Sequence, residues 1–124
     1  MVEWNTYDLV EFFGVIPQED SDKTYVSFEV EKEGVRLDVT FFRYVSDVYI
    51  SIYQSAGDEP TFSTEIKNSP GMRYLKNANG WECLEIAAPH RYHEFFEEEW
   101  IIPMGARIRI NPRIKVEMFQ PSAS

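Results

Sequence analysis

The residues of this 124-residue chain that could do chemistry are few, and their densest group lies near residue 90. His90, His93, Glu94 and Glu97 combine imidazole and carboxylate groups within eight positions. If the segment is helical, His93 and Glu97 share one face because they are four residues apart, and His90 lies one turn away. Imidazole and carboxylate ligands on one face can hold a divalent metal ion.

A metal-dependent activity is nevertheless not what the sequence favours. The run from His93 to Glu97 has the spacing of the zinc-protease helix motif, but it carries Glu where the motif needs its second His. The chain contains only two His, so a catalytic metal would need further carboxylates from elsewhere. We therefore expect no metal and no cofactor, and we interpret the segment as solvated and charged, with metal binding as the alternative.

Nucleophilic catalysis also has little support. Cys83 falls in an expected strand between Glu82 and Leu84, with no basic neighbour in the sequence to stabilise a thiolate, so we expect a buried and inert thiol. No Ser lies in a Gly-x-Ser-x-Gly turn, and the six Gly are isolated, so neither a hydrolase elbow nor a phosphate-binding loop can be drawn. We predict that the protein is not an enzyme.

The net charge of -9 is unevenly distributed along the chain. Residues 1–100 contain 20 acidic and 8 basic residues, whereas residues 101–124 contain one acidic and four basic residues. An acidic chain repels phosphates, which argues against direct binding to nucleic acid and to anionic membranes. The basic end can lie beside acidic strands in the same fold, or the two regions can face different partners.

Length and cysteine content restrict the class of protein further. A chain of this size fits one domain over 1–124, with a frayed tail at about 120–124. The single cysteine cannot form an internal disulfide, which favours a cytoplasmic location. We find no signal-peptide pattern at the start and no apolar run long enough to span a bilayer.

A short helix is expected at about residues 6–13. Asn5 is a good N-cap residue. Leu9 and Phe13 belong to one apolar stripe, and Gly14 provides a stop. After the helix, residues 15–23 are polar and we expect them to form a turn.

From residue 24 onward, alternation of apolar and polar residues indicates β-strands. Four alternating segments are separated by turn residues. The mainly apolar positions of the alternation are Val26, Phe28, Val30; Val35, Leu37, Val39, Phe41; Val48, Ile50, Ile52; and Phe62 and Ile66, with Thr64 between the last two. A hairpin across 77–80 is expected to join strands at 72–76 and 81–87, and alternation returns at 107–110 and 113–119. The break at Asn111-Pro112 is interpreted as a bend or an edge position. We predict a mainly β fold, with α+β as the alternative, of about seven antiparallel strands in a meander, sandwich or curled sheet.

Residues 89–103 fit two local structures. Four aromatic residues lie near helical spacing, namely Tyr92, Phe95, Phe96 and Trp100, and Pro89 suits a first helical position. The charges oppose a helix, because basic residues lie at its start and acidic residues at its end. A short helix near 90–100 and an irregular acidic loop both remain open.

Aromatic and acidic side chains supply the candidate binding residues. The polar faces of the expected strands carry five aromatic residues, Tyr25, Phe42, Tyr44, Tyr49 and Tyr53. Either the helix or a second sheet covers them, or they are exposed for protein recognition. Acidic groups at 94–99 and 19–22 are either solubility charges or an anionic patch for a basic partner. The predicted partner-binding residues are Glu94, Phe96, Glu97, Glu98, Glu99, Trp100, Glu19, Asp20, Asp22, Tyr49 and Tyr53.

The chain is small, acidic and rich in aromatic residues, and it has no catalytic motif. In these respects it is similar in broad type to bacterial toxin-immunity proteins and to phage-encoded nuclease inhibitors. The similarity is one of composition and size over the whole chain. Together with the charge, it favours a non-enzymatic protein that neutralises a basic partner, either a toxin or a nucleic-acid-handling protein. One alternative is a structural or adaptor subunit that assembles through its sheet edges and aromatic face. A metal-binding domain or an enzyme ranks behind it, and the oligomeric state is left open.

Overall fold

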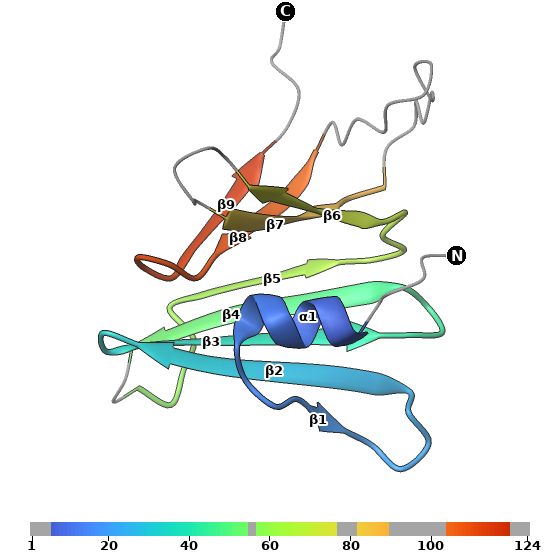
Figure 1. Ribbon diagram of the computed structural model, residues 1–124, viewed down its shortest axis with the longest axis horizontal. Coiled ribbons are helices and arrows are strands. Elements are labelled where there is room, and N and C mark those ends of the chain that lie inside the picture. Colours follow the sequence, from blue (N-terminus) through green and yellow to red (C-terminus); the bar gives the residue numbers. More distant parts are fainter. Residues whose placement is uncertain (1–5, 55–56, 77–81, 90–103, 120–124) are drawn as a thin grey trace, which may run out of the picture.

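The computed structural model describes residues 6–54, 57–76, 82–89 and 104–119. One helix and nine strands lie within these ranges: α1 Thr6–Phe13, β1 Gln18–Glu19, β2 Tyr25–Lys32, β3 Val35–Phe42, β4 Asp47–Gln54, β5 Phe62–Ile66, β6 Met72–Lys76, β7 Glu82–Ala87, β8 Gly105–Arg109 and β9 Lys115–Phe119. The strands form two antiparallel sheets, one with the order β1-β2-β3-β4-β5 and one with the order β6-β7-β8-β9 (Figure 1). The predicted mainly β fold is confirmed.

Neighbours along the chain are neighbours in each sheet, so both sheets are meanders. The three longest strands, β2, β3 and β4, pair in full register over eight residues each. The turn between β2 and β3 is made by Glu33 and Gly34, which both have positive φ, at 52° and 79°. Two consecutive residues in the left-handed backbone conformation form a hairpin turn whose twist matches that of the strands. This turn keeps the long strands in one register.

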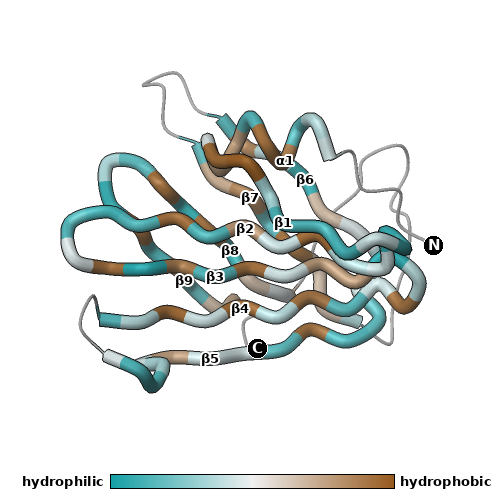
Figure 2. The backbone as a smooth tube through the Cα atoms, turned by 90° about the horizontal axis from the view of Figure 1, so that it is seen from below, coloured by the Kyte–Doolittle hydropathy of each residue, from teal (hydrophilic) through white to brown (hydrophobic). Residues whose placement is uncertain are grey.

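The core lies between the two sheets, which form a lower and an upper layer in Figure 1. Hydrophobic and hydrophilic residues alternate along the strands, as the colours of Figure 2 show, so each sheet turns one apolar face inward. Phe28, Phe41 and Leu37 of the lower sheet are completely buried, as are Leu84 and Ile108 of the upper sheet. Burying each such side chain stabilises the fold by roughly 1.5–3 kcal/mol.

Helix α1 closes the space between one edge of each sheet (Figure 1). Its Phe13 stacks on Phe28 of β2 with ring centroids 4.7 Å apart, and its Phe12 contacts Tyr74 of β6 at 5.9 Å. Gly14 ends the helix with φ at +71°, and its N–H donates to the carbonyl of Val10. The predicted helix and its glycine stop are therefore confirmed.

One local prediction was wrong. The segment 15–23 is not only a polar turn, because Gln18 and Glu19 form the short strand β1 against β2. The bend predicted at Asn111-Pro112 is confirmed. It connects β8 and β9, which pair with each other from Arg109 and Lys115 onward.

Several predictions lie outside the described residues: the N-cap Asn5, the hairpin turn at 77–80, the choice between helix and loop at 90–103, and the tail at 120–124. In the part of the chain that the structure describes, no helix is long and apolar enough to cross a membrane.

Gly105 is required by its conformation and by its surroundings. Its φ is +154°, and a Cβ atom at this position would lie 1.9 Å from the carbonyl oxygen of Ile86. We expect Gly105→Ala to lower the free energy of unfolding by about 2–4 kcal/mol, because relief of the clash must disturb the β7–β8 ladder. Urea unfolding measures this change.

The matched control is Gly57→Ala, whose added Cβ would meet only ordinary contacts, the nearest at 3.5 Å. We expect its stability to stay within about 1 kcal/mol of the unsubstituted protein. Equal stabilities of the two variants would contradict the importance of the Gly105 backbone.

Candidate functional site

The five-stranded sheet has a second face, turned away from the core, which we call the outer face. Figure 2 looks onto it. Because side chains alternate along a strand, the residues between the buried positions point to this side. Across the register they are Tyr25, Ser27, Glu29 and Glu31 of β2, Arg36, Asp38, Thr40 and Phe42 of β3, Asp47, Tyr49, Ser51 and Tyr53 of β4, and Ser63 and Glu65 of β5.

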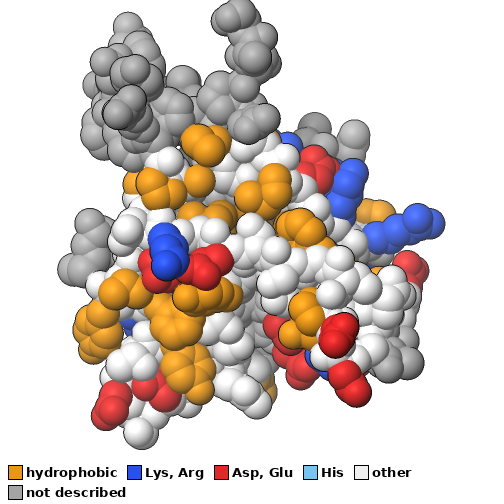
Figure 3. All heavy atoms as spheres, turned by 180° about the vertical axis from the view of Figure 1, so that it is seen from behind, with side chains coloured by type: hydrophobic (Ala, Val, Ile, Leu, Met, Phe, Trp, Pro, Cys, Tyr) orange, Lys and Arg blue, Asp and Glu red, His pale blue; other side chains and the backbone are white. Residues whose placement is uncertain are grey.

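One end of the outer face carries three aromatic rings in contact. The rings of Tyr25 and Phe42 have centroids 6.1 Å apart, and those of Phe42 and Tyr49 are 5.2 Å apart in a T-shaped pair. Helix α1 and the four-stranded sheet pack on the opposite side, so the expectation that one of them covers these rings is wrong. Tyr49 is 38% exposed. Figure 3, which views the molecule from behind rather than onto the outer face, shows hydrophobic side chains gathered beside charged ones in its lower half.

The other end of the outer face is charged. Arg36 Nε lies 3.4 Å from a carboxylate oxygen of Glu29 and 3.7 Å from one of Asp38. The Arg36 guanidinium also lies over the ring of Tyr53, 4.1 Å from its centroid. This cation–π contact holds the predicted residue Tyr53 against the sheet.

Asp38 is incompletely paired in this group. Among the described residues, neither its Oδ1 nor Arg36 Nε has a hydrogen-bond partner, and both atoms are shielded from solvent. Burial raises the pKa of Asp38, Arg36 opposes this shift, and the negative charge of Glu29 adds to it. The carboxylate is therefore a position where an added cation would be stabilised.

Neutral hydroxyl groups occupy the space between the aromatic and charged ends. Ser27 and Thr40 are 3.0 Å apart across β2 and β3, and Ser51 and Ser63 are 3.3 Å apart across β4 and β5. Burial and the charge of Glu65, to which the hydroxyl is hydrogen-bonded, raise the pKa of Tyr49. The Tyr49 hydroxyl therefore remains protonated at neutral pH.

The predicted acidic group at 19–22 is mostly engaged within the fold. Glu19 pairs with Arg43 at 2.8 Å. Asp20 accepts hydrogen bonds from the backbone N–H groups of Thr24 and Tyr25, at 2.6 and 3.1 Å, and from the Thr24 hydroxyl. The bond from Thr24 is the main reason why the pKa of Asp20 is lowered. Asp22 is exposed in the adjoining turn. Asp20 thus fixes the start of β2, where Tyr25 enters the outer face.

The other predicted binding residues lie outside the described residues. These are Glu94, Phe96, Glu97, Glu98, Glu99 and Trp100, together with the weighed metal ligands His90 and His93. Their role in binding stays a prediction. Within the described ranges, no three His, Cys, Asp or Glu side chains are grouped so that they could hold a metal ion.

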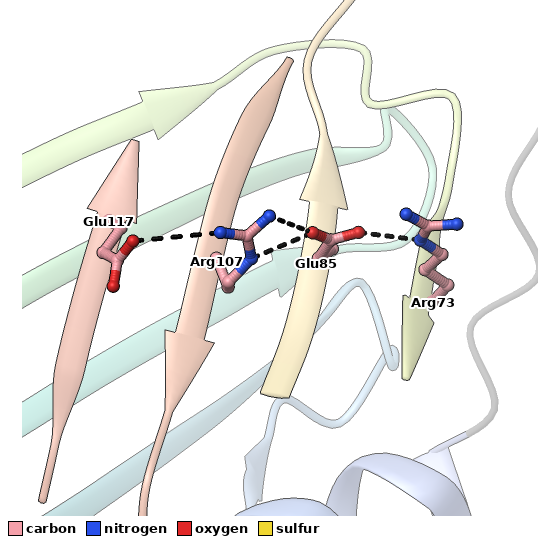
Figure 4. A network of polar contacts seen from close by, with 4 residues as sticks. All are labelled: Arg73, Glu85, Arg107 and Glu117. Carbon is pink, nitrogen blue, oxygen red and sulfur yellow. Dashed lines mark hydrogen bonds and ion pairs between the residues drawn. The ribbon is translucent and has the colours of Figure 1, made fainter. Parts of the chain in front are cut away.

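A second polar group crosses the four-stranded sheet (Figure 4). Register places Arg73, Glu85, Arg107 and Glu117 in one row. Glu85 is only 1% exposed, and it pairs with Arg73 at 2.7 Å and with Arg107 at 2.6 Å. Arg107 also lies 3.8 Å from Glu117. The basic C-terminal strands therefore lie beside acidic residues of the same sheet, which is the first of the two interpretations of the charge gradient.

Cys83 is buried in this sheet, as expected. Cys83 has no basic neighbour in the sequence, but the fold brings the charges of Arg107, Arg109 and Arg73 near enough that they act to lower its pKa. Burial and the charge of Glu85 nevertheless prevail over these arginines, and the pKa of the thiol is raised. A raised pKa keeps the thiol protonated and a poor nucleophile.

A cavity of about 270 Å³ lies between α1 and the edge of the four-stranded sheet. Its lining includes Asp8, Glu11, Phe12, Tyr74 and Cys83. Burial is the main cause of the raised pKa of Tyr74, and the charges of Asp8 and Glu11 add to it. Since Tyr74 and Cys83 both have raised pKa values, the lining offers no activated nucleophile among these groups.

Comparisons with known proteins give one informative result. No family model matches the chain, and no curated protein sequence matches it. Among solved structures, the fold is similar to a chain of the "Contact-dependent growth inhibition toxin - immunity protein complex from Klebsiella pneumoniae 342". The TM-score is 0.72 at 14% sequence identity, and the match covers 92% of this chain and 91% of that chain. The two chains therefore share a fold over nearly their whole lengths.

Proposed function

We propose that the chain is a non-enzymatic, immunity-type protein that binds a toxin and neutralises it. The observation that carries this proposal is the shared fold with a component of a toxin–immunity complex over nine-tenths of both chains. An exposed sheet face with aromatic rings and hydrogen-bonding groups supports it, because aromatic residues are enriched at protein interfaces. In this role the chain acts in the cytoplasm and needs no cofactor.

The partner is proposed to be basic. The strand residues of the outer face carry the carboxylates of Glu29, Glu31, Asp38, Asp47 and Glu65 and the cationic side chain of Arg36. At the end of β5, Lys67 pairs with Glu65 at 3.4 Å, so carboxylates still outnumber cations there. With a net charge of -9, the protein attracts a positively charged surface over long distances and accelerates its approach. A toxin that handles nucleic acid has such a surface where it binds phosphates, and carboxylates placed there would block it.

The direct test is protection from a toxin. Reading frames that neighbour the gene for this chain are expressed in a bacterial host, each alone and together with the chain. We expect one of them to arrest growth alone and to become harmless when the chain is present. The proposal would be contradicted if growth arrest persists when the chain is present. It would also be contradicted if none of the neighbouring reading frames arrests growth.

The acidic stretch at 94–99 is proposed to steer the toxin toward the binding face. Replacing Glu97, Glu98 and Glu99 with Lys should slow association by roughly tenfold or more at low salt, because long-range attraction between charges acts mainly on the encounter rate. Surface plasmon resonance with the toxin from the growth test measures the rate. The control is Asp58→Lys with Glu59→Lys, two exposed acids of the β4–β5 connection. An unchanged rate in the triple variant would exclude this stretch from the encounter.

A structural subunit that assembles with copies of itself is the second candidate. Phe62 on the edge strand β5 and Met118 on the edge strand β9 are exposed apolar side chains. Exposed apolar residues on strand edges favour pairing between chains. Light scattering distinguishes the candidates, since a stable homo-oligomer without a foreign partner would favour the subunit and a monomer the toxin binder.

A further inference from the structure

Asp38 lies at the centre of the outer face. Its strand, β3, is the middle strand of the five, and the register sets it between Glu29 on β2 and Ser51 on β4. The aromatic rings of Tyr25, Phe42 and Tyr49 lie toward one end of the face, and the Arg36–Tyr53 pair lies toward the other. Its side chain is 32% exposed, so a protein that docks on this face meets it near the middle of the contact.

The surroundings of Asp38 do not satisfy its charge. The ion pairs of Arg36 with Glu29 and Asp38, at 3.4 and 3.7 Å, are longer than the ~2.7–2.9 Å of a strong charge-assisted hydrogen bond. Oδ1 of Asp38 has no partner among the described residues, whereas Asp20 accepts three hydrogen bonds. A half-buried carboxylate with incomplete partners costs stability, and proteins keep such costs mainly at functional sites.

The face also has the features that select arginine over lysine. A guanidinium group is planar, pairs with a carboxylate through two parallel hydrogen bonds and stacks on aromatic rings, whereas an ammonium group is a point charge. Arg36 already lies over the Tyr53 ring beside Asp38, 4.1 Å from its centroid, so this face accommodates a guanidinium on an aromatic side chain. Arginine is enriched at the centres of protein interfaces for the same reasons.

We propose that Asp38, with Glu29 beside it, receives an arginine side chain of the partner protein at the centre of the outer face. This inference rests on the proposed function and names the chemistry of its central contact. The arginine pairs with the exposed part of the Asp38 carboxylate and with Glu29, and it adds positive charge where the contacts of Arg36 are long. Its aliphatic stem lies on the neighbouring rings. Asp38 is thus kept for binding at the expense of the stability of the free chain.

The first experiment uses the full chain without a partner. Asp38→Asn is expected to raise the melting temperature by roughly 2–4 °C, because a neutral amide avoids the cost of an incompletely paired charge. Asp22→Asn, at an exposed site, should leave it unchanged. Asp20→Asn should lower it, because that carboxylate is fully used within the fold. A lower melting temperature for Asp38→Asn would make Asp38 a structural residue and overturn the inference.

The second experiment titrates the ¹⁵N-labelled chain with the peptides acetyl-(Arg-Gly)₃-amide and acetyl-(Lys-Gly)₃-amide, followed by NMR. We expect the arginine peptide to shift amide signals of β2, β3 and β4 and to bind more tightly than the lysine peptide. Asp38→Asn should weaken the arginine peptide by roughly fivefold, and Asp22→Asn by less than about twofold. Equal binding of both peptides, shifts away from these strands, or equal losses in both variants would overturn the inference.

The outcomes of these two experiments do not depend on the outcome of the growth test. If no neighbouring reading frame is toxic but the arginine peptide binds at Asp38, the site stands and the toxin proposal falls. If the chain protects against a toxin while Asp38→Asn changes neither stability nor peptide binding, the function stands and the assignment to Asp38 falls.

Discussion

Replacing Arg107 with Ala is expected to lower the free energy of unfolding by about 3–5 kcal/mol. Arg107 donates from Nε and Nη2 to the same carboxylate oxygen of Glu85, at 2.9 and 2.6 Å (Figure 4). Glu85 is almost completely buried, so the variant leaves one of its oxygens without a partner and without access to water. Arg73 donates to the other oxygen, at 2.7 Å. Loss of one partner from a buried ion pair is among the most destabilising single changes.

Urea unfolding of matched variants separates this effect from the loss of a positive charge in general. Arg113→Ala is the control, because Arg113 is 84% exposed and lies 4.0 Å from Glu33, and it should change stability by less than about 0.5 kcal/mol. In the Arg107→Ala background, Glu85→Gln should restore part of the loss, since a neutral amide is less costly to bury. Strictly additive effects would show that the two side chains do not act as a pair.

The local elements of this fold were predictable because their signals are local. The spacing of Leu9 and Phe13 with Gly14 behind them was enough to place α1, and strict alternation was enough to place β2, β3 and β4. Strand β1 was missed because two residues are too few for a periodic pattern. The row around Glu85 was also missed, since Arg73 and Arg107 lie 12 and 22 residues away and only the register brings them together.

The residues of the candidate site also divide into those that the sequence could indicate and those that it could not. Tyr49 and Tyr53 could be proposed from the sequence because aromatic residues on a polar face are unusual. The structure places both on the outer face, and their role in binding stays a prediction. Asp38 was missed, although alternation places it on that face, because the incomplete pairing of a carboxylate depends on distances to Glu29 and Arg36. Asp20 was counted among the binding residues because its acidic neighbours suggested a patch. Its hydrogen bonds with Thr24 show a local structural role. The sequence could have suggested this role, because an Asp shortly before a strand often accepts hydrogen bonds from nearby backbone groups.

Reversing the charge at the centre of the outer face should have the largest effect on toxin binding. The variant Glu29→Lys with Asp38→Lys replaces the two carboxylates that flank Arg36 and puts three cations together. A partner arginine would then meet like charges in a partly desolvated contact. We expect the affinity to fall by at least ~100-fold, mostly through faster dissociation, because interactions at the centre of an interface act on the lifetime of the complex.

Kinetics with the toxin from the growth test separate this central contact from long-range attraction. The control, Asp58→Lys with Glu59→Lys, makes the same change in net charge on exposed residues outside the outer face. It should slow association modestly and leave dissociation unchanged, whereas the central variant should accelerate dissociation even at high salt, where exposed charges are screened. Both double variants could lose affinity equally, and high salt could bring their affinities back to that of the unsubstituted chain. Net charge alone would then account for binding. In that case the outer face is not the contact, and Asp38 has no special role in it.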